Sequence, residues 1–535
     1  MKAGNSEGTA AVEGNQFRMR KRTQAGVDQL VLQIAFPPVA TDAPTAPTVA
    51  PRARANDAAG VVQGDGAAAS SAEPEPARLK SSGRKWYSLY DKIYAPRNLE
   101  AAWLRVQANG GAAGLDRLTL ARFEADAAAR LEHLSADLRA KTYRPQPVRR
   151  VLIPKSGGGQ RPLGIPTVTD RIVQQAVLQI LGPIFEAKFH SRSHGFRPGR
   201  GCATALDVVD RAVRHGYAWV VDADIRAFFD TVDHDRLVAA VNEEIADGSV
   251  LKLITLMLRA GVVQPAVGDL EPTELGTPQG GPLSPLLANI YLHRFDERMA
   301  AAGYGVVRYA DDFVIFARSE AEAGAALDLA RHVLEEELGL TLHPEKTGVV
   351  SVATGFAFLG FHYFRDPATG RMAKEVRRQS VQRFRDAVRA RTPRLRTQRP
   401  VKAKHVTLYR LRNNARVREM IAAVNRHLRG WHGYFRAVWS RHPETPFGSF
   451  DSFVRRRLRT AITGRVGAGW WLVRLSNLVF RALGLVCLDD LHREYRQARQ
   501  DRRGSRARQG RHGGEPYAGK PHVRFGREGG RVTAS

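Results

Sequence analysis

The sequence predicts an α+β protein with disordered ends, and three observations lead to this prediction. Short, β-rich apolar runs such as VRRVLIP, WVVDADI and VVRYADDFVIF alternate with amphipathic helical segments in residues 141–365. The strand signals then fade, and basic helical patterns dominate residues 366–485. Residues 1–78 are rich in Ala, Pro, Gly and Thr and show no sustained periodicity, which is typical of a disordered segment.

Charge and cysteine content limit the classes of partner and compartment. The 535 residues include 82 Lys and Arg against 53 Asp and Glu, a formal net charge of +29, which indicates a polyanionic partner or a negatively charged surface. No apolar run reaches the length of a membrane-spanning helix, so we expect nucleic acid and no membrane. Only Cys202 and Cys487 are present, too few for a zinc module or a disulfide scaffold, which indicates a reducing, cytoplasmic compartment.

The first ordered part is expected to be a helical N-terminal extension over residues 79–140. Within it Leu99, Ala102, Trp103 and Val106 recur at helical spacing, which predicts a helix that packs on a core. The run VRRVLIP then predicts a strand, and KSGGGQRP predicts the loop of a hairpin.

The next elements follow in the order helix, strand, hairpin, helix and strand. Thr167 precedes Asp170 at capping-box-like spacing, which predicts the start of a helix. One face of this helix carries Ile172, Val173, Ala176, Val177, Ile180 and Leu181. WVVDADIRAFFDTVDH predicts a strand that runs into a turn, EAGAALDLARHVLEEELGL an amphipathic helix and FAFLGFHYF another strand. Residues 486–535 form a basic tail that we expect to be mostly disordered.

Two adjacent carboxylates interrupt the apolar run VVRYADDFVIF. Successive side chains of a strand point to opposite faces, so Asp311 and Asp312 approach one point only if the backbone turns between VVRY and FVIF. Two close carboxylates repel each other unless a cation lies between them, and Mg²⁺ prefers oxygen ligands. A solvated hairpin tip is the alternative interpretation of this pair alone. Asp224 ends the apolar run WVVDAD, and a third carboxylate on a neighbouring strand would complete a two-metal site for phosphoryl transfer.

These motifs occur together in one known family. From about Trp86 to about Leu483 the chain resembles the reverse transcriptases encoded by group II introns, which combine a polymerase with a maturase. YADD resembles the family's polymerase signature, DADIRAFFDTVDH its first catalytic-aspartate motif and GTPQGGPLSPLLANIYLHRFD its nucleotide-pocket motif. GFRPGRGCATAL, LGLTLHPEKT and FAFLGF resemble further blocks in the expected order. The resemblance implies a right-hand polymerase fold, with fingers and palm in residues 141–365 and a thumb and maturase domain in residues 366–485.

The resemblance also assigns a catalytic centre. Asp224, Asp311 and Asp312 are the implied catalytic residues, and they would hold two Mg²⁺ ions together with the backbone carbonyl of Ile225. Asp311 is expected to be the more direct ligand of the adjacent pair.

Five residues are implied to bind the incoming nucleotide, and Ile225, already named as a metal ligand, is one of them. Phe229 falls where the family places an aromatic ring beneath the sugar, which would exclude a ribose 2′-hydroxyl, while Phe228 or Phe229 is expected to be plain core. Lys155 and Arg161 flank the SGGGQ loop and resemble the fingers residues that hold the triphosphate, a task that suits ammonium and guanidinium groups. Gln279 lies in PQGG, where the family contacts the nucleotide.

The later, basic part of the chain is predicted to bind RNA. RGWHGYFR resembles the maturase-specific region of the family, and it interleaves basic and aromatic side chains, which suit backbone contact and base stacking. The predicted RNA-binding residues are Arg426, Arg429, Arg436, Arg455, Arg456 and Arg457. The two cysteines cannot build the zinc-containing endonuclease of many members, so the chain resembles the endonuclease-lacking branch.

Taken together, the resemblance implies an RNA-directed DNA polymerase that also binds its parent group II intron RNA to assist splicing and mobility. Its other expected partners are an RNA template with a DNA primer, dNTPs and target DNA. Two alternatives remain open. One is a reverse transcriptase recruited to phage defence, CRISPR spacer acquisition or diversity generation, and the other is a splicing factor without polymerase activity.

Overall fold

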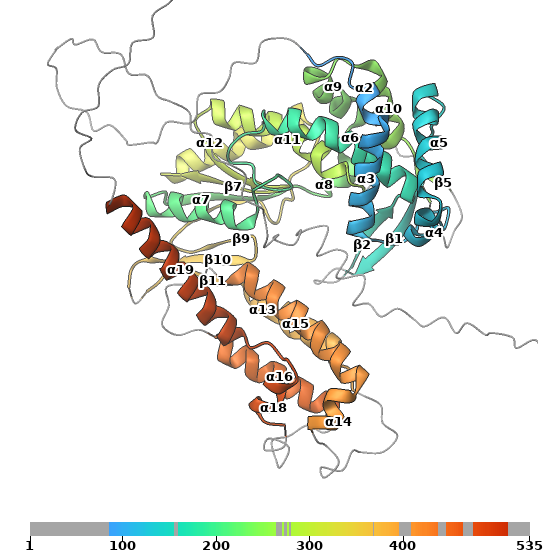
Figure 1. Ribbon diagram of the computed structural model, residues 1–535. Helices are drawn as coiled ribbons and strands as arrows, with labels where there is room; N and C mark the ends of the chain where they lie inside the picture. Colours follow the sequence, from blue (N-terminus) through green and yellow to red (C-terminus); the bar gives the residue numbers. More distant parts are fainter. Residues whose placement is uncertain are drawn as a thin grey trace, which may run out of the picture. The chain divides into compact units, whose positions relative to one another are not determined.

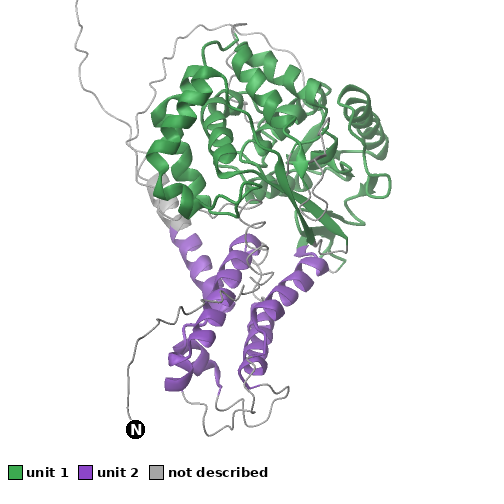
Figure 2. Cartoon of the chain, turned by 90° about the vertical axis from the view of Figure 1, so that its right-hand side faces the viewer, with its two compact units in different colours: residues 1–374 green, residues 375–535 purple. Residues whose placement is uncertain are grey.

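The chain divides into two compact units, Met1–Lys374 and Glu375–Ser535 (Figures 1 and 2). The computed structural model describes residues 85–154, 159–263, 270–271, 275–277, 280–367, 369–394, 408–436, 446–463 and 475–511. The predicted disorder of residues 1–78 therefore lies outside the described residues. None of the helices in the described ranges combines the length and the apolar character needed to cross a membrane.

The N-terminal extension of the first unit is helical, as expected. It contains α2 (Tyr90–Tyr94), α3 (Pro96–Asn109), α4 (Leu120–Ala125) and α5 (Ala127–Ala140). Pro96 stands in the first turn of α3, where its missing N–H is not needed, and Gly110 ends the helix with φ of 68°. The residues at helical spacing, Leu99 to Val106, form the buried face of α3.

A four-stranded sheet of order β2-β1-β4-β5 follows the extension. Its strands are β1 (Val148–Pro154), β2 (Gln160–Ile165), β4 (Val262–Val263) and β5 (Leu270–Glu271). β1 and β2 form the predicted antiparallel hairpin. Thr167 caps α6 (Val168–Glu186) by accepting a hydrogen bond from the backbone N–H of Asp170, which confirms the predicted helix start.

The second sheet, of order β6-β7-β3-β8, forms the centre of the unit, and all its strand pairs are antiparallel. Its strands are β3 (Trp219–Asp224), β6 (Gly305–Tyr309), β7 (Asp312–Ala317) and β8 (Gly348–Ser351). The surrounding helices are α7 (Cys202–Arg214), α8 (Phe228–Thr231), α9 (His234–Glu244), α10 (Gly248–Leu258), α11 (Ser284–Ala301), α12 (Glu320–Arg331) and the π-helix η1 (His332–Glu337). α12 packs along β3, β7 and β8 (Figure 1).

The run FAFLGFHYF forms a hairpin and not the single strand that its pattern predicts. β9 (Phe356–Phe358) pairs directly with β10 (Phe361–Arg365), and β11 (Met372–Val376) completes the sheet. Leu359 and Gly360 between them have φ of 46° and 80°, as a two-residue turn between twisted strands requires. Because β11 is a strand, the strand region extends beyond the expected boundary at residues 365 and 366, and the unit boundary falls within β11.

After the end of β11, the second unit is helical in the described residues. Its helices are α13 (Arg378–Arg391), α14 (Leu408–Asn413), α15 (Ala415–Phe435), α16 (Phe447–Thr463), α18 (Asn477–Ala482) and α19 (Leu488–Arg511). An aromatic cluster joins α13, α15 and α16, because the Trp431 ring lies 4.8 Å from Phe384 and 5.1 Å from Phe450 between centroids.

Helix α19 shows that part of residues 486–535, which were expected to be mostly disordered, is ordered. The carboxylate of Asp451 on α16 accepts hydrogen bonds from the backbone N–H groups of Leu488 and Asp489, at 2.9 and 3.2 Å, and so holds the first turn of α19. Leu488 and His492, one helical turn apart, are buried. The Arg-rich composition of this segment does not indicate the narrow buried face that Leu488 and His492 form. Residues 512–535 of the tail lie outside the described residues.

Candidate functional site

The sheet β6-β7-β3-β8 places the three predicted aspartates at one of its ends. Asp224 at the end of β3 and Asp312 at the start of β7 are direct cross-strand partners. Asp311 lies in the turn between β6 and β7, after Ala310, whose φ of 60° is left-handed. This turn breaks the strand alternation, so two neighbouring carboxylates can approach the same end of the sheet.

Burial raises the pKa of the Asp311 carboxyl above its usual value, and the negative charge of Asp224 raises it further. The guanidinium groups of Arg161 and Arg308 act in the opposite direction. The Asp311 carboxylate is therefore a group whose charged form would gain from a nearby cation.

Lys346 supplies a positive charge at the end of the sheet that carries the aspartates. Sequence analysis did not identify this residue. Its Nζ donates to Oδ2 of Asp224 at 2.7 Å. The loop that carries Lys346 also pairs with the backbone after β3, because the N–H of His343 donates to the carbonyl of Asp224 at 2.8 Å. The only sequence signal is that Lys346 is the single Lys or Arg in the block LGLTLHPEKT.

The donors at this end of the sheet fit a hard divalent cation in their chemistry. They are carboxylate oxygens, and one of them already binds an ammonium group. Ile225 lies opposite Leu342 in an isolated antiparallel bridge. The hydrogen bonds of this bridge are made by the residues on either side of Ile225, and the carbonyl of Ile225 takes no part in them. Within the described ranges, no three or more His, Cys, Asp or Glu side chains are arranged closely enough to hold a metal ion.

Phe228 and Phe229 differ in their surroundings. Phe228 is only 2% exposed, and its ring packs against Tyr291 on α11, so it is a core residue. Phe229 is 9% exposed, and its carbonyl accepts from the N–H of Thr277 at 2.7 Å. A Cβ on Gly276 would lie 2.8 Å from the same carbonyl oxygen, so the segment before PQGG approaches α8 closely.

Of the other predicted nucleotide-binding residues, Ile225 is described and buried, and Arg161 is described as well. Arg161 lies on β2 opposite Ile153, is exposed, and its charge acts on the Asp311 carboxyl. Lys155 and Gln279 lie outside the described residues. After Gln279, a Cβ on Gly280 would lie 2.4 Å from the carbonyl oxygen of Gly164, so this backbone packs closely against β2.

The predicted RNA-binding residues of α15 lie on its exposed side. Arg426 and Arg429 on α15, together with Arg436 directly after its end, are called the α15 arginines below, and all three are exposed. The Arg436 guanidinium carbon also lies 4.5 Å from the centroid of the Tyr495 ring. Leu428 and Trp431 are buried. The remaining buried residues of this helix include Val417, Met420, Ile421, Val424 and Phe435.

The three arginines of α16 are not equivalent. Arg456 is exposed, and Arg455 donates to the hydroxyl of Ser452 at 3.1 Å. Arg457 is half-buried and donates to the carbonyl of Thr392, at the end of α13, at 3.2 Å. This guanidinium group therefore joins two helices of the unit, and its role in RNA binding stays a prediction. The sequence pattern RRR does not distinguish the three positions.

Comparison with known proteins identifies both parts of the chain. Residues 153–363 match the model of the reverse transcriptase (RNA-dependent DNA polymerase) family, and residues 381–471 match the maturase-specific domain of group II introns. Protein YkfC of Escherichia coli (strain K12) is 35% identical over 308 residues, which cover 50% of this chain and 80% of YkfC. The chain belongs to the group II intron reverse transcriptase/maturase family.

Other proteins match shorter parts of the chain. The group II intron-encoded protein LtrA of Lactococcus lactis subsp. cremoris is 46% identical over 169 residues, which cover 31% of this chain and 28% of LtrA. A chain of a partial Cas6-RT-Cas1--Cas2 complex matches 47% of this chain and 43% of its own length, at 25% identity and a TM-score of 0.31, and no conclusion rests on it. The predicted family, with a reverse transcriptase followed by a maturase-specific domain, is confirmed.

Proposed function

We propose that the protein is an RNA-directed DNA polymerase whose catalytic residues are Asp224, Asp311 and Asp312. The observation that carries the proposal is the register of the central sheet, in which Asp224 and Asp312 are partners and Asp311 occupies the adjoining turn. These carboxylates and the carbonyl of Ile225 would hold two Mg²⁺ ions, which when bound supply Lewis-acid stabilisation for phosphoryl transfer.

The chain's own side chains would then orient the substrates. Arg161 binds the triphosphate of the incoming dNTP, together with Lys155 and Gln279. Phe229 lies at the edge of the core and excludes a ribose 2′-hydroxyl. The ring of Phe228, inside the core, packs against the ring of Phe229. Lys346 keeps the charge of Asp224 compensated.

The second proposed activity is binding of the parent intron RNA, which assists splicing and mobility. Its support is the maturase-specific match together with the exposure of the α15 arginines and Arg456 on helices whose other faces are buried. An RNA template with a DNA primer and target DNA are the other proposed partners, and the cytoplasm is the proposed location.

The test is primer extension by Asp311→Asn on an RNA template, with binding of the parent intron RNA measured in parallel. We expect dNTP incorporation to fall by at least about 10²–10³-fold, because an electrostatic contribution to the transition state is lost. Intron RNA binding should remain largely intact. Extension near the wild-type rate would reject the assignment of the aspartates.

Sequencing of the RNA that co-purifies with the protein tests the intron assignment. Enrichment of a group II intron supports it, whereas an unrelated RNA favours a reverse transcriptase recruited to another system. A wild-type protein that binds the intron but extends no primer would be a splicing factor without polymerase activity.

A further inference from the structure

A fully buried arginine lies two residues before the turn that carries the aspartate pair. Arg308 on β6 has an exposed fraction of 0%, inside a strand whose neighbours are apolar. Burial of a guanidinium group destabilises the fold unless an opposite charge compensates it and its N–H donors have hydrogen-bond acceptors. The role of Arg308 therefore follows from the partners that it binds.

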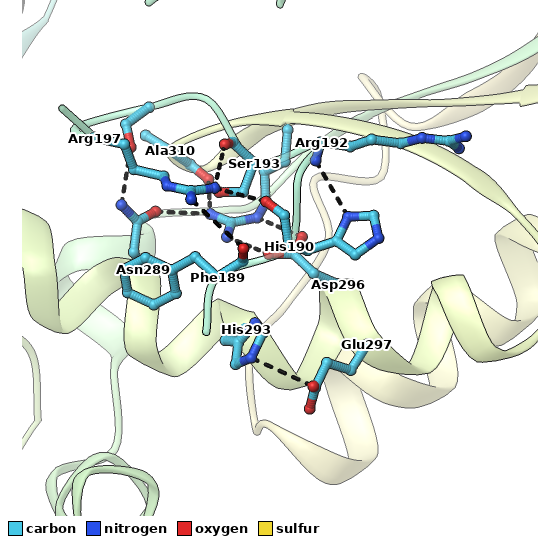
Figure 3. Close-up of polar contacts among 12 residues, drawn as sticks. Phe189, His190, Arg192, Ser193, Arg197, Asn289, His293, Asp296, Glu297 and Ala310 are labelled. Carbon is cyan, nitrogen blue, oxygen red and sulfur yellow. Dashed lines mark hydrogen bonds and ion pairs between the residues drawn. The ribbon is translucent and has the colours of Figure 1, made fainter. Parts of the chain in front are cut away.

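The partners of Arg308 come from α11 and from the aspartate turn itself. Its Nε and Nη2 donate to the two carboxylate oxygens of Asp296, at 2.7 and 2.5 Å. Its Nη1 donates to Oδ1 of Asn289 at 3.1 Å and to the carbonyl of Ala310 at 2.9 Å. Figure 3 labels Asn289, Asp296 and Ala310 in this region and marks hydrogen bonds with dashed lines. One side chain thus ties the backbone immediately before Asp311 to α11.

The opposite side of the turn is closed by the segment that precedes α7. Asn289 donates from Nδ2 to the carbonyl of Gly195 at 2.8 Å, so the same side chain reaches both segments. A Cβ on Gly195 would lie 2.3 Å from the backbone nitrogen of Ala310, which leaves no room for a side chain. The turn is therefore held between α11 and Gly195, and it cannot shift toward either without breaking a bond or making a clash.

We propose that Arg308 is a positioning residue that fixes the backbone at Ala310 and thereby places Asp311 and Asp312 for metal binding. The inference rests on the proposed polymerase function and deepens it. Arginine suits this role because its planar fork binds a carboxylate through two parallel hydrogen bonds and still has a donor for the turn. A lysine has a single charged nitrogen and would not hold Asp296 and Ala310 in the same geometry.

The test uses Arg308→Lys, with Arg171→Lys as its matched control. Arg171 on α6 is also a buried arginine, but its guanidinium group donates to the backbone carbonyls of Gly110 and Ala112, at 3.2 and 2.9 Å, and not to the turn or to the segment that carries Gly195. Both variants should lose stability. The discriminating readout is Mn²⁺ binding, followed by electron paramagnetic resonance in the complex with a dideoxy-terminated primer-template and a dNTP, against Asp311→Asn as baseline.

For Arg308→Lys we expect Mn²⁺ affinity to fall about tenfold, which corresponds to about 1.4 kcal/mol, and Arg171→Lys to bind as the wild type. Gly195→Ala, which pushes the turn from the other side, should also weaken binding. If Arg308→Lys does not fold, Asn289→Ala removes one bond of the network and should show a smaller decrease. Wild-type affinity in Arg308→Lys, or an equal loss in Arg171→Lys, would overturn the proposal.

The outcome also separates this inference from the proposed function. If Asp311→Asn abolishes incorporation while Arg308→Lys binds Mn²⁺ normally, only the positioning role fails. If Asp311→Asn retains both Mn²⁺ binding and incorporation, the polymerase site itself has been assigned to the wrong residues.

Discussion

Replacing Lys346 by Met should lower the Mg²⁺ concentration needed for half-maximal primer extension. The ammonium group lies 2.7 Å from Oδ2 of Asp224, so a metal ion that binds this carboxylate has to displace it. Met keeps most of the aliphatic side chain and removes the charge. The carboxylate is then available to the metal ion without competition.

The size of the effect follows from the exposure of the two side chains. Lys346 is 59% and Asp224 is 39% exposed, so solvent screens their attraction. Opposite charges about 4 Å apart gain about 1 kcal/mol in water, and exposed ion pairs contribute about 0.2–1 kcal/mol to stability. Because about 1.4 kcal/mol corresponds to a factor of ten, the Mg²⁺ requirement should fall by about 1.5- to 5-fold.

The assay is a Mg²⁺ titration of primer extension under single-turnover conditions, from which the half-saturating concentration and the maximal rate are read separately. Lys374→Met is the control, because Lys374 forms a similar ion pair with Asp210, at 2.6 Å, that involves none of the catalytic aspartates. It should leave the Mg²⁺ requirement unchanged. An unchanged or increased requirement in Lys346→Met would refute the competition between the ammonium group and the metal ion.

Three further outcomes are expected. Phe229→Val should raise ribonucleotide incorporation, measured by extension with rNTPs, because the ring at the edge of the core is lost. Gln at all three α15 arginines should weaken intron RNA binding and flatten its salt dependence, by up to about one log–log unit per lost phosphate contact, in a salt titration. Burial and the neighbouring His492 and Arg436 lower the pKa of His432 to about 4, so the unfolded chain binds a proton below about pH 6.5 while the folded protein does not. Stability should therefore fall from pH 7 to pH 5, by about 1–2 kcal/mol for this group, and urea unfolding should show a smaller difference in His432→Gln.

Each of these outcomes has its own control. Phe228→Val should mainly lower stability, by about 2 kcal/mol or more, because this ring is in the core. If it raises ribonucleotide incorporation and Phe229→Val does not, the positions are assigned one residue off. The α15 variant should extend a short generic primer-template nearly as well as wild type, and an equal loss on both substrates would contradict a specific maturase role. An unchanged pH dependence in His432→Gln would contradict the titration of this side chain.

Residues with a local signal were the ones that sequence analysis placed well. Asp311 and Asp312 interrupt an apolar run, and Asp224 ends one, so their positions at the end of strands followed from periodicity, as did the Thr167 cap. Lys346 has no such signal, because its contact with Asp224 depends on a loop that returns beside β3. Sequence analysis also missed Arg308, although its place inside a strand was visible in the pattern. A single charge inside a strand pattern does not indicate whether it faces solvent or a buried carboxylate.

The helical unit shows a second limit of pattern reading. The segment after Val486 carries so many charged residues that composition predicted disorder, yet a few buried side chains and the carboxylate of Asp451 organise α19. Such a cap comes from a helix far earlier in the chain. Neither local composition nor helical periodicity contains that information.

The order of strands in the central sheet has a consequence for synthesis on the ribosome. β3 pairs on one side with β7 and on the other with β8, which ends at Ser351, and Lys346 lies 122 residues after its partner Asp224. Pairing over such separations forms slowly, because a long loop has to close before any contact is gained. A nascent chain that has emerged only through β3 thus carries an unpaired strand. The catalytic end of the sheet can assemble only when the chain through β8 has left the exit tunnel, so premature termination before that point yields no partial polymerase.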